Sequence, residues 1–435
     1  MTKSLFWHRR DLRINDNSGL HKALKSGKDV QPIFVFDKNI LNSLPKNDQR
    51  VLFIYQYVQK LKEAYLNLGS ELWVFYGNPL EVIPKITVEF GFNTVFTNRD
   101  YEPYALERDK KMFELLKAEN VDFQGAKDHV IFEKSEVMKD DGLPYTIFTP
   151  YSRKWKSKLN DFFLSLYEVE KYLKNLNPRG ESFEIPTLKQ MGFEETQLFP
   201  FQKESTTDEL IQNYSERRNF PSVNGTSKLS VHLRFGTISI RELARKAAKL
   251  DETFLNELIW RDFYQMIIYH FPSSVKSAFK SQYDQIDWEK NEFHFQAWCQ
   301  GKTGYPLVDA GMRELNQTGF MHNRVRMVVA SFLTKHLLLD WRWGEAYFAE
   351  KLMDFELASN VGGWQWAAGC GCDAAPYFRV FNPAAQQEKF DKKFEYIKKW
   401  VPEFGTPSYP KPIIEHKFAR HRVLERFKKA LNHTA

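Results

Sequence analysis

The sequence predicts an α/β plus all-α fold: an N-terminal open parallel sheet with flanking helices, a long connector, and a C-terminal helical domain. Two observations predict it. Short β-branched and aromatic runs alternate with helical patterns over about the first 130 residues, and almost every segment after about residue 205 has helical periodicity. With 435 residues, 43% of them hydrophobic, the chain is long enough to bury two or three cores.

Four segments of the first part predict strands, and two longer segments between them predict helices. The expected strands are SLFW, VQPIFVFD, ELWVFYG and NTVFTNRD, and the expected helices are RVLFIYQYVQKLKEAYLNLG and ALERDKKMFELLKAEN. Such alternation is typical of parallel strands with helices on both faces. The first strand is not followed by the G-x-G-x-x-G loop of dinucleotide-binding folds, so a ligand here would lie at the carboxyl ends of the strands without that loop.

The periodicity weakens between about residues 130 and 200, which predicts a connector that wraps a surface. Helical patterns follow in TFLNELIWRDFYQMIIYHF, FMHNRVRMVVASFLTKHLLLDW and WGEAYFAEKLMDFELA. The final segment, HKFARHRVLERFKKALNHTA, predicts a basic amphipathic helix. We therefore expect an α/β domain over 1–130, a connector over 131–200 and a helical domain over 201–435.

The bulk composition narrows the class of protein. A net charge of +7 and a pI of about 8.9 fit a polyanionic partner. No apolar run reaches the length of a membrane span, and the N-terminus lacks the apolar region of a signal peptide, so we expect a cytoplasmic protein that contacts no membrane. Cys299, Cys370 and Cys372 form neither a disulfide framework nor a zinc-ligand pattern, so we expect small buried thiols and no metal site.

One predicted helix carries a mixed acidic, basic and aromatic stripe. Phe254, Glu257, Arg261 and Tyr264 are spaced to share a face, with Trp260 beside them, while the other side is largely apolar. The stripe is either plain surface or the wall of a cavity. A second predicted helix, beginning near residue 323, repeats the pattern and favours a cavity.

Other polar residues have two interpretations. The loop GTSKLS, residues 225–230, either caps a helix, which the local sequence favours, or binds phosphate. Asp354 and Asn360 either cap helix ends or hydrogen-bond a heterocycle. Four arginines either contact phosphates or pair with acids: Arg324, Arg326, Arg342 and Arg379.

The segment NVGGWQWAAGCGCDAAPYFRVFNP, residues 360–383, combines glycines with tryptophans. Pro376 and Pro383 exclude a single helix through it, and the glycines allow the backbone to approach another group closely. Seven tryptophans lie between residues 260 and 366, which indicates a core of large rings, a stacking surface or an electron path. They are Trp260, Trp288, Trp298, Trp341, Trp343, Trp364 and Trp366.

This segment, together with the preceding DFELAS, and five other segments resemble the photolyase/cryptochrome family over nearly the whole chain. The other five are FWHRRDLRINDN, GTSKLSVHLRFGTIS, NELIWRDFY, GKTGYPLVDAGMRELNQTGFMHNRVRM and EKFD. NELIWR, MHNRVRM and the GGWQW segment most resemble class I cyclobutane pyrimidine dimer (CPD) DNA photolyases. Members of the (6-4) and animal cryptochrome branches usually carry a histidine-containing motif where this chain has Asn323-Arg324.

The resemblance implies FAD in the helical domain, active as the reduced anion FADH⁻. Asp354, paired with Arg326, is expected to accept a hydrogen bond from the isoalloxazine edge, and Asn360 is expected to face flavin N5. The residues expected at the phosphates and sugar are Tyr214, Thr226, Ser227, Lys228, Leu229 and Ser230. Phe254, at a position where some relatives have a tryptophan near the adenine, and Arg261 complete the expected FAD site.

The resemblance also implies light-driven repair of CPDs, in which an electron passes from excited FADH⁻ to a flipped-out dimer and returns after the ring splits. Expected lesion-pocket residues are Glu257, Trp260, Asn323, Met327 and Trp366. Expected DNA contacts are Arg218, Arg324, Arg379 and Gln386. Trp364, Trp341 and Trp288 match the tryptophan chain that carries electrons to the flavin in this family.

Two alternatives stay open: a cryptochrome-type blue-light photoreceptor, and a photolyase for (6-4) lesions or single-stranded DNA. The lesion-pocket residues favour CPD repair. We therefore expect UV-damaged DNA as the partner, and we expect a monomer without an obligatory protein partner. The Asn-Glu pair by which some relatives hold a folate antenna appears here as Tyr104-Ala105. A second antenna chromophore could therefore be a deazaflavin, a flavin or a differently bound folate, or its site could be empty.

Overall fold

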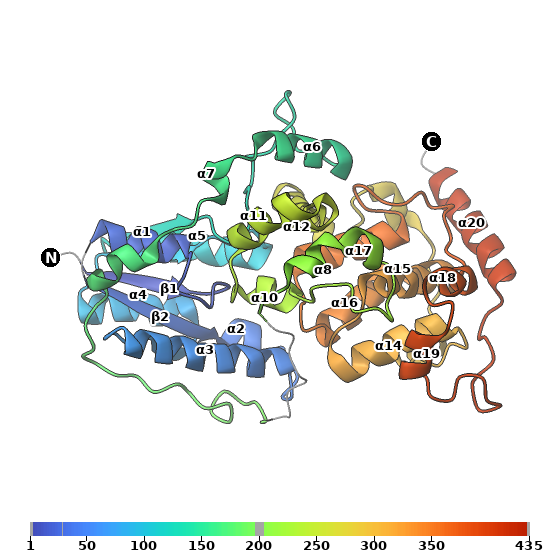
Figure 1. Ribbon diagram of the computed structural model, residues 1–435, viewed down its shortest axis with the longest axis horizontal. Coiled ribbons are helices and arrows are strands. Elements are labelled where there is room, and N and C mark those ends of the chain that lie inside the picture. Colours follow the sequence, from blue (N-terminus) through green and yellow to red (C-terminus); the bar gives the residue numbers. More distant parts are fainter. Residues whose placement is uncertain (1–2, 28, 196–203, 433–435) are drawn as a thin grey trace. The chain divides into compact units, whose positions relative to one another are not determined.

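The computed structural model describes residues 3–27, 29–195 and 204–432, which form two compact units (Figure 1). The first unit takes residues 1–136, 156–206 and 228–249; the second takes 137–155, 207–227 and 250–435. Residues 196–200 of the expected connector, and 201–203 and 433–435 of the expected helical domain, lie outside the described residues. Within the described ranges, no helix is both long enough and apolar enough to cross a membrane.

The first unit is built on a five-stranded, fully parallel sheet in the order β3-β2-β1-β4-β5, which confirms the predicted α/β class. The strands are β1 (Ser4–His8), β2 (Val30–Asp37), β3 (Trp73–Gly77), β4 (Thr94–Asn98) and β5 (Asp122–Ala126). The chain runs outward from β1 to β3 and then returns to place β4 beside β1. The carboxyl ends of β1 and β4 therefore flank the switch point of the topology, where ligands bind in folds of this kind.

Helices cover both faces of this sheet. Leu5, Trp7 and Val95 point into a core that also contains Ile83 of α4 (Pro79–Phe90) and Met112 of α5 (Pro103–Ala118). Successive strand residues face opposite sides, so Phe6 and His8 face the other way. There His8 Nε2 lies 2.8 Å from the hydroxyl of Tyr65 in α3 (Gln49–Asn67), and α1 (Ser18–Ser26) packs on the same side, against Phe6.

The fifth strand was not predicted. β5 has the sequence DFQGA, lies at the edge of the sheet and is largely half-exposed, so it shows neither a buried apolar run nor a regular alternation. The remaining elements of the first unit are short helices. They are α2 (Lys38–Leu41), α7 (Asp161–Leu164), a 3-10 helix (Val169–Asn175), α10 (Ser230–Phe235) and α11 (Ile240–Leu250).

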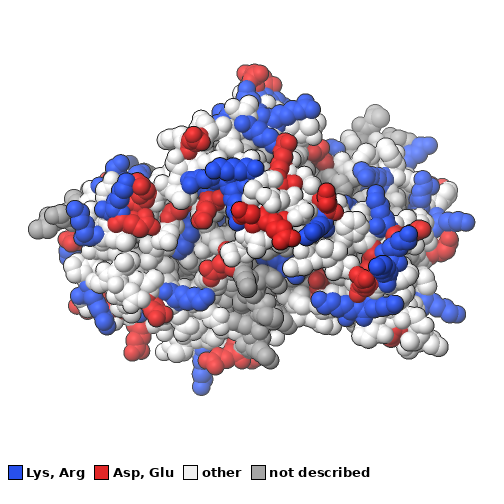
Figure 2. Space-filling model, viewed as in Figure 1, with Lys and Arg blue, Asp and Glu red and all other residues white. Residues whose placement is uncertain are grey.

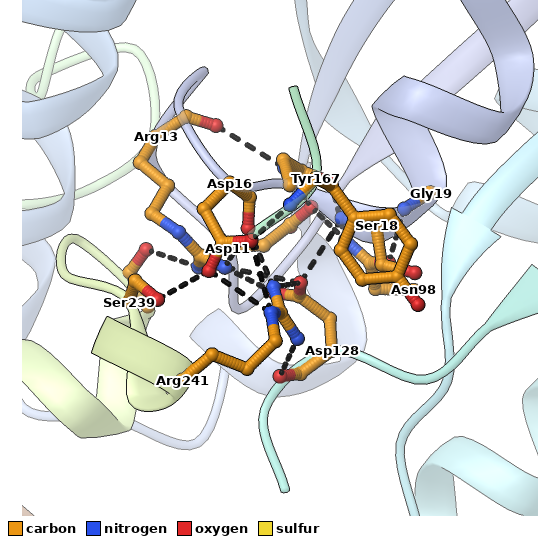
Figure 3. Close-up of polar contacts among 12 residues, drawn as sticks. Asp11, Arg13, Asp16, Ser18, Gly19, Asn98, Asp128, Tyr167, Ser239 and Arg241 are labelled. Atoms are coloured by element: carbon orange, nitrogen blue, oxygen red, sulfur yellow. Dashed lines mark hydrogen bonds and ion pairs between the residues drawn. The ribbon is translucent and has the colours of Figure 1, made fainter. Parts of the chain in front are cut away.

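A buried polar network fixes the carboxyl ends of the strands in the first unit (Figure 3). Asp16 accepts from Arg241 Nε at 2.9 Å, and Asp128 accepts from Nη2 of Arg13 and of Arg241, both at 2.8 Å. The oxygens of the two carboxylates also accept from the Tyr167 and Ser18 backbone N–H groups and the Ser239 hydroxyl. These bonds join segments more than 200 residues apart in sequence.

The second unit is helical, as predicted. Its main helices are α8 (Asp208–Gln212), α9 (Tyr214–Arg217), α12 (Glu252–His270), α13 (Glu292–Cys299), α14 (Pro306–Thr318), α15 (Asn323–Ser331), α16 (Trp341–Lys351), α17 (Leu357–Ala368), α18 (Pro383–Phe390), α19 (Glu395–Trp400) and α20 (His416–Asn432). They enclose one large apolar core that includes Trp298, Trp341 and Trp364. The expected basic C-terminal helix is confirmed as α20.

Two predicted helices are interrupted. The pattern that begins at Phe320 forms α15 and then a π-helix (Phe332–His336), and the chain leaves it through Leu338 at a φ of +54°. The next pattern ends with α16 at Lys351, because five residues separate it from α17. Apolar periodicity continues across both breaks, since the residues there are also buried, and so it did not reveal them.

The first half of the glycine- and tryptophan-rich segment is helical, although its glycines do not favour a helix. Residues 360–368 belong to α17, which ends at Gly369 with a φ of +88°. Gly362 and Gly363 thus lie inside a helix, and the chain becomes irregular only after Gly369, before the prolines. The glycines have to be explained by helix packing and by access to the helix surface.

Candidate active site

Helix α12 provides the acidic and aromatic wall of the candidate site. Asp251 caps the helix by accepting from the Phe254 backbone N–H at 2.6 Å. Leu258 and Ile259 are buried, whereas Glu257 and Trp260 are half-buried on the mixed stripe. Tyr264, at one end of the stripe, lines a shallow hollow that is open to solvent and lies between α12, α17 and residues 371–374. Phe254, Glu257 and Arg261 do not line this hollow, so the cavity interpretation holds only for Tyr264 at the end of the stripe.

Glu257 pairs with Arg218, which follows α9, and 31% of its side-chain surface remains exposed. Burial raises the pKa of the Glu257 carboxyl, and the charge and hydrogen bond of Arg218 lower it by less, so the pKa stays above its ordinary value. Arg218 also lies over the ring of Tyr214, 5.4 Å from its centroid, and that ring meets Phe254 edge-on at 5.0 Å. Four predicted site residues thus form one contact group between α9 and α12.

Two ion pairs precede α17. Arg326 Nη2 donates to Asp354 at 2.9 Å, as predicted from the resemblance, and Arg261 Nη2 donates to Glu356 at 3.0 Å. Neither Asp354 nor Asn360 caps a helix, because the residue before α17 is Glu356, which makes no side-chain capping bond, and Asn360 lies one turn inside the helix. The capping interpretation of these two residues is therefore wrong.

Glu345 of α16 is a site residue that the sequence analysis missed. The Asn360 amide nitrogen donates to the Glu345 backbone carbonyl at 3.0 Å and to its carboxylate at 2.9 Å. Burial raises the pKa of Glu345, while its hydrogen bond with Asn360 lowers it by a smaller amount. These bonds engage the Asn360 amide nitrogen and leave its amide oxygen as the group that can accept from a ligand.

Glycines bring the helices of the site close together. A Cβ atom at Gly362 would lie 2.3 Å from Cδ1 of Tyr264, and one at Gly344 would lie 2.1 Å from the Trp364 ring, so a larger residue at either position would separate two helices. Gly363 differs, because a Cβ there would have none of the described atoms within 4 Å. This stretch of helix surface is open to a flat ligand.

The three expected electron-transfer tryptophans belong to one core. Trp364 and Trp341 are each 2% exposed, and Trp288 is half-buried against the same core. Trp364 meets Phe348 edge-on at 5.0 Å. Its indole Nε1 is buried and has no hydrogen-bond partner among the described residues, which suits a role in packing or electron transfer better than one in polar recognition.

Three predicted DNA-contacting arginines, Arg218, Arg324 and Arg379, lie close together in the second unit, and we call the surface that they form the rim. Burial lowers the pKa of Arg324, and the neighbouring charges of Arg218 and Arg379 lower it further, so the three cations lie close together. Arg324 donates to the Asn219 side chain at 2.7 Å and lies 4.3 Å from the centre of the Phe390 ring. Arg379 is exposed and carries no resolved ion pair within the described ranges.

The other rim residues complete this surface. Asn323 is exposed, Met327 contacts Arg324, and the Gln386 side-chain oxygen has no hydrogen-bond partner among the described residues. Lys and Arg side chains also predominate on the displayed face over α18, α19 and α20 (Figure 2). Exposed basic residues there include Lys389, Lys398, Lys399, Lys417, Arg420, Lys428 and Lys429. By contrast, Arg342 pairs with Asp284 at 2.6 Å and with Asp340 at 3.2 Å.

The loop 225–230 does not cap α10 with a side chain. The residue before this helix is Leu229, which makes no side-chain capping bond, so the capping interpretation is wrong. Lys228 has a φ of +53°, while Thr226 and Ser227 are half-buried. Thr226 and Ser227 belong to the second unit, and Lys228, Leu229 and Ser230 belong to the first.

The residues present in the second unit fit a flavin. Gly363 leaves open helix surface, the Asn360 amide oxygen is available to accept, and Arg326 with Asp354 offers a donor and acceptor pair at one edge. In the part of the chain that the structure describes, no group of three His, Cys, Asp or Glu residues could hold a metal ion. Cys299 and Cys370 are buried, and Cys372 is half-buried.

Comparison with known proteins identifies the family. Residues 4–170 match the DNA photolyase model, and residues 254–408 match the model of the FAD-binding domain of DNA photolyase. The chain is 37% identical to the deoxyribodipyrimidine photo-lyase of Synechococcus sp., covering 95% of this chain and 93% of that protein.

Solved structures agree in fold over almost the whole chain. A class III photolyase from Agrobacterium tumefaciens has a TM-score of 0.85 at 30% identity, covering 99% of this chain and 98% of that one. A Sulfolobus tokodaii photolyase with two FAD molecules has a TM-score of 0.83 at 34% identity, with coverage of 98% and 100%. A Synechocystis sp. cryptochrome reaches 0.84 at 25% identity, with coverage of 98% and 99%. The chain belongs to the photolyase/cryptochrome family and carries its FAD-binding domain.

Proposed function

We propose that this protein repairs cyclobutane pyrimidine dimers in DNA in a light-driven reaction that uses FAD in its active form, FADH⁻. The observation that carries the proposal is a grouping of residues in the second unit. It combines Glu257, whose pKa is raised, with half-buried aromatic rings and with three arginines that lie close together. A photoreceptor has no need of this combination, whereas an enzyme that binds a flipped dinucleotide needs an acid, stacking rings and phosphate-binding cations.

The residues of the proposed site have different roles. Bound FAD supplies a light-excitable electron donor. Trp260 and Trp366 stack on the bases of the flipped dimer, since every base offers a flat face. Glu257 is assigned to a dimer carbonyl, where a carboxylic acid can donate a hydrogen bond as negative charge develops, and burial raises the pKa of its carboxyl. Arg218, Arg324 and Arg379 bind the backbone phosphates around the lesion.

Asn360 and three tryptophans are assigned to keeping the flavin in its reduced, electron-donating form. The Asn360 amide oxygen would face N5 of a bound flavin, and Glu345, which accepts from the amide nitrogen, would fix the orientation of the amide. Trp288, which is half-buried, with Trp341 and Trp364, which are both buried, would carry electrons to a bound flavin.

The proposal is tested on purified protein with an oligonucleotide that contains one thymine dimer. We expect repair under blue light after anaerobic reduction of the flavin, and none in the dark. A protein that reduces its flavin under light but leaves the dimer intact would support the second candidate, a cryptochrome-type photoreceptor, which the structural likeness to the Synechocystis sp. cryptochrome favours. A (6-4) lesion and a single-stranded dimer are tested in parallel.

Substitution of Trp364 tests the electron route separately from repair. Trp364→Phe keeps a ring of similar shape in the core but removes an oxidisable indole. We expect the variant to bind FAD, to lose photoreduction of oxidised FAD, and to repair dimers normally after chemical reduction. Photoreduction at the rate of the parent would exclude Trp364 from the route. Trp366→Phe is expected to show the opposite pattern.

We further propose a second chromophore in the first unit. A small pocket lies at the carboxyl ends of β1 and β4, lined by Arg9, Arg10, Arg99 and His129, among others. The Sulfolobus tokodaii structure, which contains two FAD molecules, supports a flavin as the occupant. The absorption spectrum and chromophore content of the purified protein test this: two flavins per chain are expected, and a single flavin with no further chromophore would contradict it.

A further inference from the structure

Part of the predicted connector belongs to the helical unit. Residues 137–155 cluster with the second unit and include the first two turns of α6 (Phe148–Lys158). Phe148, Tyr151 and Trp155 are spaced at i, i+3 and i+7, so they share one helix face. All three contact α12: Phe148 meets Trp260, Tyr151 meets Phe263 at 5.1 Å, and Trp155 Nε1 donates to Asp262 at 3.0 Å.

The contact between Phe148 and Trp260 differs from the others in geometry. The two rings are parallel to within 3°, with centroids 3.7 Å apart. Most aromatic pairs are edge-on or offset, with centroids about 4.5–7 Å apart. Tyr151 and Phe263, one turn further along α6, are tilted by 52°. Phe148 therefore covers one face of the Trp260 indole, and a base can stack only on the opposite face.

Phe148 also joins two walls of the site. Its backbone N–H, at the first residue of α6, donates to Oδ2 of Asp373 at 3.0 Å. A carboxylate at a helix N-terminus is favourable because it satisfies a free N–H group and complements the helix dipole. Asp373 in turn lines the cavity together with Tyr264 and Trp366. One residue of α6 thus contacts the Trp260 wall with its ring and the wall after α17 with its backbone.

We propose that Phe148 is a positioning residue of the lesion site, which fixes the plane of the Trp260 indole and, through Asp373, its position relative to the wall that carries Trp366. The inference rests on the proposed function, because it assigns Trp260 to the stacking of a flipped base. It adds a residue from outside the FAD-binding domain as matched (254–408) to the specificity of that site.

The test measures affinity for dimer-containing DNA and for the same DNA without a dimer. Phe148→Leu keeps an apolar side chain but removes the parallel ring. We expect it to weaken binding of the dimer-containing DNA about three- to tenfold, the range of one aromatic pair, with binding of undamaged DNA and FAD content unchanged. Phe148→Tyr, which keeps the ring, is expected to behave like the parent.

Tyr151→Leu is the matched control. It removes a ring from the same face of α6 that packs on α12 without stacking on Trp260, so it should lower the melting temperature and leave the preference for dimers unchanged. In a Trp260→Ala background, Phe148→Leu should have no further effect on the preference. The inference is overturned if Phe148→Leu retains the parental preference, if Tyr151→Leu reduces it equally, or if the Phe148 and Trp260 effects add. Failure of the parent itself to distinguish or repair dimers would instead overturn the proposed function, and this inference with it.

Discussion

Two carboxylates, one in each unit, lie beside arginine side chains, and their pKa values are shifted in opposite directions. Burial raises the pKa of Asp128 in the first unit, but the charges of Arg13 and Arg241 and several hydrogen bonds outweigh it, so the pKa lies well below its ordinary range. Burial also raises the pKa of Glu257 in the second unit, and there the single partner, Arg218, does not reverse the shift. The number of donors around the carboxylate decides the outcome.

This difference separates a structural site from a reactive one. Both oxygens of Asp128 accept hydrogen bonds from groups of the first unit, so its negative charge is fully engaged and leaves nothing for a ligand. Glu257 has one ion-pair partner and an exposed side, so it can still take up a proton or a ligand. The first arrangement stabilises a fold, whereas the second retains the freedom that chemistry requires.

The largest expected effect comes from breaking the engaged carboxylate. Asp128→Ala removes a carboxylate that pairs with both Arg13 and Arg241 and leaves Arg241 with Asp16 as its carboxylate partner among the described residues. Loss of one partner of a buried ion pair costs about 3–5 kcal/mol. We expect a loss of this size in the free energy of unfolding, measured by urea denaturation. Asp128→Asn, which keeps the shape, should lose stability in the same direction.

The control for Asp128 is an exposed ion pair of the same unit. Glu107 pairs with Lys111 at 2.7 Å, and both side chains are more than half exposed. Exposed pairs of this kind contribute little to stability because solvent screens them, so Glu107→Ala should change stability little. A loss below about 1 kcal/mol for Asp128→Ala would show that the network is not the structural element that we infer.

The second effect falls on the reactive carboxylate. Glu257→Gln keeps the shape but removes both the negative charge and the titratable proton. We expect unchanged FAD content and repair per absorbed photon lowered by about 10- to 100-fold, the range for one charge-assisted hydrogen bond. The measurement is light-dependent repair at saturating DNA with equal flavin occupancy. Glu216→Gln, an exposed acid on α9, is the control, and equal yields for Glu257→Gln and the parent would remove Glu257 from the mechanism.

Sequence reasoning succeeded where partners are close in sequence. The stripe on α12 was predictable because helical spacing alone places Glu257, Trp260 and Tyr264 together. The contacts between Asn360 and Glu345 and between Trp260 and Phe148 were not, because they depend on how separate helices pack and no short motif marks them. The resemblance to a family named the ligand-facing residues but not those that hold them in place.

A third buried ionisable group sharpens the comparison, because the described residues include no ion-pair partner for it. Lys335 of the π-helix donates to the Ala368 carbonyl at 2.7 Å and lies 3.8 Å from the centre of the Phe427 ring. Burial lowers its pKa from 10.5 to about 7, and neighbouring Cys370 raises it by less. Above pH 7 the unfolded chain therefore holds a proton that the folded chain lacks, so the contribution of Lys335 to stability rises with pH.

The test compares the parent with Lys335→Met between pH 7 and 8.5. The parent should gain stability relative to the variant by up to about 1.4 kcal/mol per pH unit, because other titrations cancel in the difference. The upper limit avoids titration of Cys370, whose thiol pKa burial raises to about 12, so its unfolded form ionises first. A difference that does not depend on pH would mean that Lys335 stays charged in the folded protein.

The smallest expected effect concerns charge that is left open to solvent. Arg324 lies near Arg218 and Arg379, and an anion that bound all three would relieve their mutual repulsion. Each phosphate contact releases about one counter-ion, so Arg324→Gln should weaken binding of UV-irradiated DNA modestly and reduce the slope of log K against log salt by about 1.

Arg342→Gln is the matched control, because Arg342 already pairs with Asp284 and Asp340 and its substitution should leave the slope unchanged. Equal slopes for Arg324→Gln and the parent would place the phosphate contacts elsewhere, and the exposed lysines of α18 to α20 would then be the next residues to substitute. If the slope falls as expected, the comparison of charged groups extends to Arg324. The hydrogen-bonding capacity of Asp128 is used within the fold, that of Glu257 is used in part, and that of Arg324 remains available to a phosphate of a bound nucleic acid.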